Sequence, residues 1–561
     1  MALAPRKCHR RSVSGPAPGT VRLVPLGGLG LIGMNCLAIE QSDGIVVVDC
    51  GIGFSDGSLG IDVLHPDFGW LLDRADQVRG IFLTHGHEDH IGGLPYLLEE
   101  LDVPVWGPAH ALAMARRRLT EHEFTDSELD LRPVRAGDVT RVGSFEIEPV
   151  RVTHSIVEAS ALRIATAAGT ILHTGDFNID PDPPDGEPTD EARLGRIGDE
   201  GVALMLSDST NSDVPERAGT ERTVASAVET LVLGAPSLVV IAMFASNVQR
   251  LITFGDMAVR LGRKVVVLGR SLESQVAIAT QLRRLAWPSN LMVSADGLAS
   301  LPRERVLVLA GGTQAEPGSA LRRLSIGQHP LLKLERGDTV LLSSRVIPGN
   351  ERQVFEMQND LLRLGVTLHT RVTAPGIHTS GHAAQKEQRR MLELVRPRCF
   401  LPVHGTLGHL QRHAELAREF GVREVEVVED GIPIVCDGGT LATEARVQHG
   451  RIAVSLGGEE LDDAILKERA DLGRSGVVVV ALTLARDGRG VAPPRVVARG
   501  VPAVTATQVR VLEREIARSL ESYREGRGLT LEDFVKRSAR RKIDEFSGTR
   551  PLVEVLTSVV D

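Results

Sequence analysis

Three histidines and one aspartate lie within six residues of one another in the segment FLTHGHEDHIGG, residues 82–93. These side chains are His85, His87, Asp89 and His90. The residues before them have the pattern of a buried strand, and apolar residues recur at helical spacing after them. The cluster therefore belongs to a strand-to-helix turn, where irregular backbone can direct several side chains at one point. Imidazoles and a carboxylate around one point indicate a divalent metal ion.

Further metal-ligand candidates are histidines and aspartates at strand ends, because such ends can meet the same turn. His154 ends the segment RVTH, Asp176 ends ILHTGD, and His404 ends FLPVH. Seven donors of these types suit two divalent ions of low coordination number. We expect Asp176 to bridge the ions, and the other donors to divide into His85, His87 and His154 for one ion and Asp89, His90 and His404 for the other. The histidines that lack such a context, and that we expect to be structural, are His110, His122, His173 and His369.

The segment GLGLIG, residues 28–33, matches the G-x-G-x-x-G fingerprint of dinucleotide sites, with Asp49 at a suitable distance. That fingerprint requires a helix directly after it. Here the following segments, MNCLAIEQ and DGIVVVD, both have the pattern of strands. We therefore interpret the segment as a glycine-rich hairpin near the metal site.

Two kinds of strand pattern position these residues. Short strands and Gly-rich turns extend from Val21 to about Ala218. Between residues 221 and 310 the strands become continuously apolar and alternate with helical segments, which predicts a parallel sheet with crossover helices. Near the end of the chain, Val509, Leu512 and Ile516 lie at helical spacing, and a second helix is predicted to begin at Thr530.

Composition limits the classes of protein that the chain can represent. The formal net charge is −9, which argues against a polybasic protein that binds nucleic acid without specificity. Five scattered cysteines form no CxxC pair, so a reducing cytosol is favoured over a disulfide framework. No apolar run approaches the ~18 residues of a membrane helix. The first twenty residues are basic and carry neither Asp nor Glu, so we expect a disordered tail rather than a secretory signal.

The order of the metal-ligand candidates resembles the metallo-β-lactamase superfamily, and the parallel-sheet segment resembles the β-CASP domain of its nucleic-acid-processing members. Longer motifs, including FLTHGHEDHIGGLPYLL, SDSTN, FASNVQRL, IPGNE, IHTSGHA and PVHG, are similar to those of the bacterial ribonuclease J family. The β-CASP family has motifs named A, B and C. Asp208 matches motif A, His382 matches motif B and His404 matches motif C. A histidine at motif C is associated with RNA-processing members.

The resemblance implies an α/β protein: an αββα metallo-β-lactamase sandwich with an inserted β-CASP parallel-sheet domain and a small α/β C-terminal domain. The expected boundaries are 1–20 for the basic tail, 21–218 and 346–445 for the two parts of the metallo-β-lactamase domain, 219–345 for the β-CASP domain, 446–460 for a linker and 461–561 for the C-terminal domain.

The implied activity is metal-dependent hydrolysis of RNA in maturation and decay. The enzyme would act as a 5′-to-3′ exonuclease that favours 5′-monophosphate ends. Whether it also acts as an endonuclease is left open by the resemblance. His382, oriented by Asp208, is the candidate general acid; the alternative is that it only binds phosphate. The candidate substrate-binding residues are His378, Thr379, Ser380, Gly381, His382, Ser246 and Asn247. For Ser246 and Asn247, ordinary helix capping is a competing interpretation.

Three alternatives stay open: a DNA nuclease, a hydrolase of small thioesters or lactones, and a non-catalytic scaffold for RNA decay. The expected cofactors are two divalent ions per chain, zinc first, with manganese equally compatible with His and Asp ligands. Single-stranded RNA is the expected partner, together with a homodimer or homotetramer and an RNA-decay complex or ribosome. We expect no membrane association and a cytoplasmic location.

Overall fold

The computed structural model describes residues 15–54, 57–347, 349–486, 489–502, 504–523 and 529–560. The first fourteen residues, most of the expected basic tail, lie outside the described residues. The chain separates into two compact units. One unit comprises residues 63–451 with the N-terminal residues up to 56, and the other comprises 452–561 with 57–62. Within the described ranges, no helix has the length and apolar character needed to traverse a bilayer.

Two facing sheets form the centre of the larger unit. The first has the strand order β24-β23-β1-β3-β4-β7-β8-β9 and the second β10-β11-β12-β13-β14-β20-β22. The first is made of β1 (Val21–Gly27), β3 (Cys36–Gln41), β4 (Gly44–Val48), β7 (Val78–Phe82), β8 (Val105–Gly107), β9 (Leu131–Pro133), β23 (Ile434–Cys436) and β24 (Leu441–Thr443). The second is made of β10 (Thr140–Val142), β11 (Phe145–Arg151), β12 (Ser160–Thr166), β13 (Gly169–His173), β14 (Leu204–Asp208), β20 (Cys399–Val403) and β22 (Glu424–Val425).

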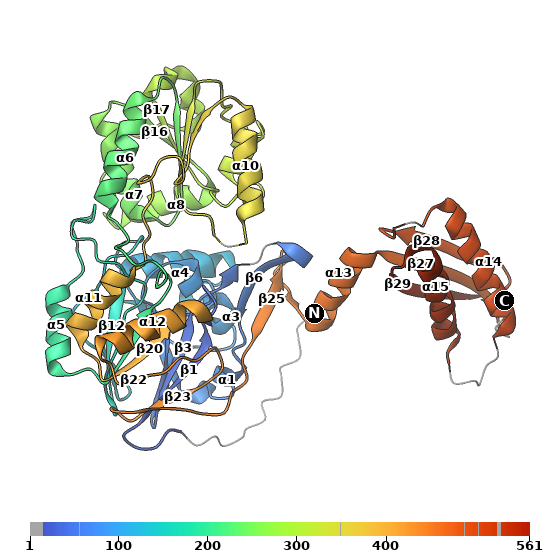
Figure 1. Ribbon diagram of the computed structural model, residues 1–561, viewed down its shortest axis with the longest axis horizontal. Coiled ribbons are helices and arrows are strands. Elements are labelled where there is room, and N and C mark those ends of the chain that lie inside the picture. Colours follow the sequence, from blue (N-terminus) through green and yellow to red (C-terminus); the bar gives the residue numbers. More distant parts are fainter. Residues whose placement is uncertain are drawn as a thin grey trace. The chain divides into compact units, whose positions relative to one another are not determined.

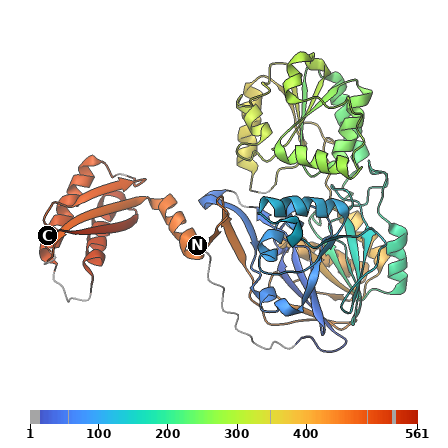
Figure 2. The ribbon, with the colours of Figure 1, turned by 180° about the vertical axis from the view of Figure 1, so that it is seen from behind.

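Both faces of these sheets are buried, which explains the apolar strands. In β4, Val46 and Val48 contribute to the core between the sheets, whereas Ile45 and Val47 pack under the outer helices. The outer helices are α1 (Gly69–Leu72), α2 (Glu88–Ile91), α3 (Leu94–Leu98) and α4 (Ala109–Glu121) beside the first sheet, and α5 (Glu191–Glu200), α11 (Gln385–Val395) and α12 (Leu407–Phe420) beside the second. Figure 1 labels α1, α3, α4, α5, α11 and α12 of this set around the sheets, and Figure 2 shows the same arrangement from behind. The expected αββα sandwich is confirmed.

An inserted parallel sheet has the strand order β16-β17-β15-β18-β19. Its strands are β15 (Val239–Met243), β16 (Lys264–Leu268), β17 (Val306–Ala310), β18 (Thr339–Ser343) and β19 (Thr367–His369), and every pairing between them is parallel. The flanking helices are α6 (Glu221–Gly234), α7 (Val248–Arg260), α8 (Arg270–Gln281), α9 (Ala320–Ser325) and α10 (Glu351–Arg363). Figure 1 shows helices on both sides of this sheet. Because β19 pairs with β18, the sheet continues past residue 345, the boundary expected for this domain.

The smaller unit ends in a three-stranded sheet of order β28-β27-β29. Its elements are α13 (Asp463–Ser475), β27 (Val477–Ala485), β28 (Arg495–Arg499), α14 (Ala506–Ser522), α15 (Leu531–Ser547) and β29 (Leu552–Val560). The predicted apolar stripe of α14 is confirmed, because Leu512 and Ile516 are buried in the core of this unit. The Thr530 hydroxyl accepts from the Asp533 backbone N–H at 3.1 Å, so this residue caps α15 as predicted. The short strand β25 (Arg451–Ser455) lies within the expected linker.

Candidate metal centre

The proposed metal ligands lie at the carboxyl ends of strands from both sheets. His85 and His87 follow β7, His154 follows β11, Asp176 follows β13 and His404 follows β20. Asp89 and His90 belong to the short helix α2, directly after the β7 turn. In α/β structures, ligands bind beyond the carboxyl ends of the strands, where the loops that follow the strands converge.

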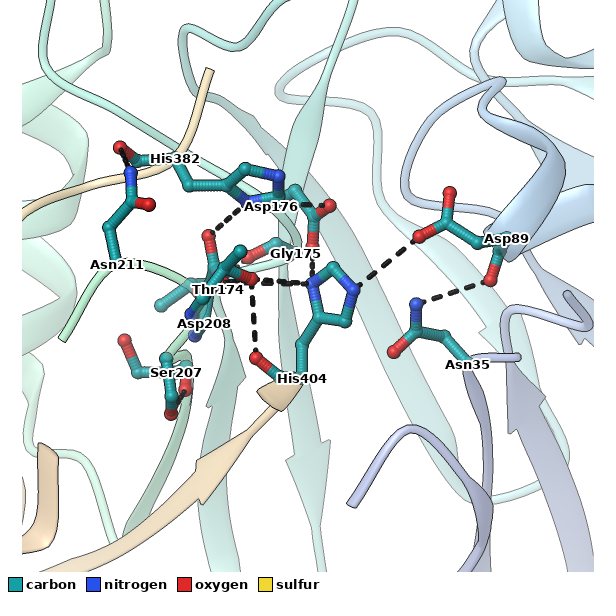
Figure 3. A network of polar contacts seen from close by, with 12 residues as sticks. Asn35, Asp89, Thr174, Gly175, Asp176, Ser207, Asp208, Asn211, His382 and His404 are labelled. Carbon is teal, nitrogen blue, oxygen red and sulfur yellow. Dashed lines mark hydrogen bonds and ion pairs between the residues drawn. The ribbon is translucent and has the colours of Figure 1, made fainter. Parts of the chain in front are cut away.

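The side chains converge in two groups that share Asp176. His85, His87, His154 and Asp176 each offer a ligand atom within 4.8 Å of the others, and so do Asp89, His90, Asp176 and His404. In the first group, His87 Nδ1 is 3.0 Å from His85 Nε2 and 3.2 Å from His154 Nε2. In the second group, His404 Nε2 is 3.4 Å from Asp89 Oδ2, as Figure 3 illustrates. These two groups contain the residues of the expected division, and a third group, described below, joins Asp176 and His404 with Asp208 and His382.

The chemistry of this donor set fits divalent cations. Burial, followed by the neighbouring His154, lowers the pKa of His87 to about 3, and burial lowers the pKa of His154 to about 4. These rings are therefore neutral and present lone pairs to a common point. His404 Nε2 is buried, forms no hydrogen bond with a described residue and faces the Asp89 carboxylate at 3.4 Å. Imidazole and carboxylate donors serve zinc and manganese alike, so the donor set does not choose between them.

Asp49 orients one of the proposed ligands and was missed as a site residue by the sequence analysis. Its Oδ2 accepts a hydrogen bond from His90 Nδ1 at 2.7 Å, which leaves His90 Nε2 facing Asp176 Oδ2 at 3.2 Å. The backbone N–H of Thr84 donates to Asp49 Oδ1 at 2.8 Å. Partners of this kind fix the tautomer and orientation of ligand histidines. The available signal was its position at the end of the strand in VVVDCG, the same criterion that selected Asp176.

The glycine-rich segment GLGLIG lies beside this centre. Its residues Leu29–Gly30 form β2, which pairs in parallel with β21 (Gly405–Thr406), directly after His404. The next elements are β3 and β4, and in the described residues 31–48 no helix follows the glycine-rich segment. This is expected for a hairpin and not for a dinucleotide site.

His382 and Asp208 form a hydrogen-bonded pair next to the metal-ligand groups. His382 Nδ1 lies 2.9 Å from Asp208 Oδ2, and its side chain is 21% exposed while that of Asp208 is fully buried. Burial alone would raise the pKa of Asp208, but the adjacent His382 helps to hold it well below its usual range. His382 Nδ1 is also 3.8 Å from Asp176 Oδ2. The geometry therefore admits a second role, in which Asp208 and His382 join Asp176 and His404 around an ion.

The loop that carries the other substrate candidates is tied down by hydrogen bonds. The Gly381 carbonyl accepts from His154 Nδ1 at 2.7 Å, so this residue orients a proposed metal ligand. Asn211, which the sequence analysis missed, donates to Ser380 Oγ at 2.8 Å. It also donates to the His382 carbonyl at 2.9 Å, as Figure 3 shows. Its place in SDSTN, three residues after Asp208, was the only signal in the sequence.

The two candidates in the inserted domain lie at the start of α7. Asn247 Oδ1 accepts from the backbone N–H of Arg250 at 3.0 Å, so its side-chain oxygen caps the helix, in agreement with the competing interpretation. Ser246 precedes it and is partly exposed. Because Asn247 Oδ1 already accepts this capping hydrogen bond, the structure gives no support for it as a substrate-binding atom.

Comparison with known proteins identifies the family. Family models match along most of the chain: the metallo-beta-lactamase superfamily over residues 29–269, the ribonuclease J beta-CASP domain over 237–361, the Zn-dependent metallo-hydrolase RNA specificity domain over 374–428 and the ribonuclease J C-terminal domain over 464–560. Ribonuclease J of Mycobacterium tuberculosis strain H37Rv is 36% identical over 543 residues, which cover 95% of this chain and 96% of that protein. This chain belongs to the ribonuclease J family.

Other ribonuclease J proteins are similarly related. The Helicobacter pylori 26695 protein is 37% identical over 82% of this chain and 68% of its own length, and the Synechocystis protein is 36% identical over 90% and 79%. A solved structure of a protein of unknown function from Enterococcus faecalis V583 aligns with a TM-score of 0.54 at 17% identity, covering 74% of this chain and 100% of that one, which shows the fold alone. The chain thus has the domains of a metal-dependent ribonuclease of the ribonuclease J family.

Proposed function

We propose that this chain hydrolyses RNA from the 5′ end toward the 3′ end, favours a 5′-monophosphate, and can also cut internally. The observation that carries the proposal is the His382–Asp208 pair, with Nδ1 and Oδ2 2.9 Å apart, beside two groups of metal-ligand candidates. Two divalent ions, when bound, would act as Lewis acids on the phosphate and activate water. The ligands we propose are His85, His87, Asp89, His90, His154, Asp176 and His404.

In this proposal His382 supplies the proton that the leaving group needs. Attack of a water oxygen on phosphorus breaks the bond between phosphorus and O3′, and O3′ takes a proton as it leaves. With the ring protonated, Nδ1–H donates to Asp208 while Nε2–H is available for transfer to O3′. The products are a 5′-phosphate and a 3′-hydroxyl. The partial exposure of His382 allows a substrate to reach it.

The loop before His382 is suited to a terminal phosphate. Ser380 Oγ accepts from Asn211 Nδ2 at 2.8 Å and from the His382 N–H at 3.2 Å, so its own O–H is left to donate. Burial, then the guanidinium groups of Arg250, Arg371 and Arg345, hold the pKa of His378 well below its usual value. Because Glu221 pairs with Arg250, Arg345 and Arg371 are the charges that would attract a phosphate dianion to the loop.

A comparison of 5′ ends tests the proposal. Purified protein loaded with zinc or manganese is incubated with RNA of one sequence carrying a monophosphate, triphosphate or hydroxyl at the 5′ end, and with matched single-stranded DNA. We expect the fastest release of mononucleotides from the monophosphate RNA. Equal rates on the three ends would refute the phosphate pocket. Equal rates on DNA would favour the DNA nuclease, and absence of any cleavage by protein holding two ions would favour the scaffold.

We also propose a homodimer or homotetramer that acts on single-stranded RNA, alone or within an RNA-decay complex or on the ribosome. Light scattering on the purified chain at several concentrations measures its mass in solution. A single species at the 60.4 kDa of one chain would contradict the oligomer.

A further inference from the structure

Arg250, in the first turn of α7, has a fully buried side chain whose guanidinium is surrounded by acceptors. Nε and Nη2 each donate to the Glu221 carboxylate at 3.2 Å. Nη1 donates to the Ser343 carbonyl at 2.6 Å, and Nη2 donates to the Thr379 carbonyl at 2.8 Å. One side chain therefore joins the start of α6, the end of β18 and the loop that leads to His382.

The remaining contact of Arg250 is with a histidine ring. Its Nη1 lies 2.8 Å from His378 Nδ1. A guanidinium has only donors and does not lose its proton in proteins, so Nδ1 must be the acceptor. A neutral imidazole that accepts at Nδ1 carries its one hydrogen on Nε2. Burial of the ring disfavours its charged form, and so does the guanidinium, because protonation of Nδ1 would place an N–H against it.

The Nε2 atom of His378 is buried and has no hydrogen-bond partner among the described residues. An unpaired buried donor is costly, so native structures tend to supply a partner or reserve the group for a ligand. Glu221 lies against the Arg250 guanidinium and neutralises its charge. An arriving anion is therefore left to meet the Nε2–H rather than Arg250 itself.

We propose that Arg250 is a positioning residue, which holds His378 as the Nε2–H tautomer so that the ring donates to the terminal phosphate of the RNA. This inference rests on the proposed function, because it assigns the donor of the proposed phosphate pocket. The tautomer needs no change when substrate binds, which makes the donor more effective than a ring that must shift its hydrogen. The competing arrangement has the hydrogen on Nδ1 and directed at the Ser343 carbonyl, which already accepts from Arg250.

A double-mutant cycle tests whether Arg250 acts through the ring. The variants are Arg250→Met, His378→Gln and the combination, and the measured quantity is the ratio of kcat/KM on 5′-monophosphate RNA to that on 5′-hydroxyl RNA. Arg250→Met should lower this ratio by about 10-fold, the value of one hydrogen bond to a charged group. Glutamine keeps an N–H near the Nε2 position and has no tautomers, so Arg250→Met should cost much less in that background. Losses that simply multiply would overturn the proposal.

Arg263→Met provides a matched control. Arg263 is another buried arginine of the inserted domain, and it donates to the carbonyls of Ser237 and Val306 at 3.1 and 3.0 Å. Its loss should reduce thermal stability without changing the ratio between the two RNA ends. A fall in the ratio equal to that of Arg250→Met would show that any buried arginine has this effect, and would overturn the assignment.

A second measurement decides the matter if Arg250→Met does not fold. The wild-type chain labelled with ¹⁵N-histidine reports which ring nitrogen is protonated, and the signal that disappears in His378→Gln belongs to His378. We expect a bare Nδ1 and a protonated Nε2; hydrogen on Nδ1 would overturn the proposal. Failure of the proposed function is distinguishable, because wild-type protein would then treat monophosphate and hydroxyl ends alike whatever the tautomer.

Discussion

Oδ2 of Asp49 lies 2.7 Å from Nδ1 of His90, although the two residues are 41 positions apart in the chain. The same oxygen accepts from the Thr84 hydroxyl at 2.8 Å, so the carboxylate is itself held in place. This relationship turns a buried carboxylate into the group that directs a proposed metal ligand, and it can be tested without touching any of the seven candidate ligands.

Asp49→Asn should weaken metal binding while leaving the fold intact. An amide is a poorer acceptor for the His90 N–H, and loss of such a partner lowers metal affinity by about 10- to 100-fold. Metal content after dialysis against a graded series of chelator concentrations measures the change. Asp130→Asn, at an exposed aspartate that pairs with Arg132, is the control. Equal metal retention in the two variants would contradict the role of Asp49.

His382→Ala should keep two ions and still bind RNA, yet lose turnover by about 10²–10⁴-fold, as expected for a lost general acid. Asp208→Asn should act through the same ring, so the two losses should be far from additive. An RNA with sulfur at the 3′-bridging position has a leaving group that needs no proton, and with manganese it should recover much of the lost rate. Loss of one ion from His382→Ala would instead identify His382 as a ligand.

Gly381→Ala should disturb the metal centre through the backbone. A Cβ at this position would lie 2.8 Å from Ser155 Cβ and 2.9 Å from His154 Cε1, closer than such atoms normally approach. The ring of His154 would have to shift, so we expect fewer than two bound ions and a loss of cleavage. Gly408→Ala is the control, since its Cβ would meet only Thr406 Oγ1 at 4.0 Å. Full metal content in Gly381→Ala would show that the loop can move aside.

The thermal midpoint should fall as the pH decreases from about 6.5 to 4. Burial lowers the pKa of His110 from 6.5 to about 4 and that of His413 to about 3, so both rings stay neutral in the folded chain. In the unfolded chain they take up protons below about pH 6.5, so the unfolded state binds more protons in this window and stability decreases. His110→Gln and His413→Gln should each flatten the dependence of the midpoint on pH relative to wild type. Unchanged slopes would show that these rings are charged in the folded chain.

The sequence correctly indicated the position of residues that directly follow a strand. Each proposed ligand from His85 to His404 follows a strand or its turn, and strands with continuous apolar residues correctly predicted the parallel sheet. The three-residue strand β19 was missed because its residues are only partly buried and lack an apolar pattern.

Residues that act through a distant partner could not be predicted in the same way. Arg250 and His378 are 128 positions apart, and their contact exists only because the inserted domain returns to the loop before His382. Asn211 and Ser380 are separated by 169 positions. No spacing rule in one sequence reports such pairs, since they depend on how the chain folds back on itself.

The inserted sheet separates the residues of the candidate centre along the chain, so the ribosome adds them in two stages. His85, His87, His154 and Asp176 have all been synthesised before the inserted sheet begins at β15, whereas His382 and His404 follow it. A nascent chain therefore lacks both the candidate acid and the last candidate ligand until the whole insert has been translated. It also lacks Gly381, whose carbonyl orients His154, so the candidate centre is complete only after His404 has been added.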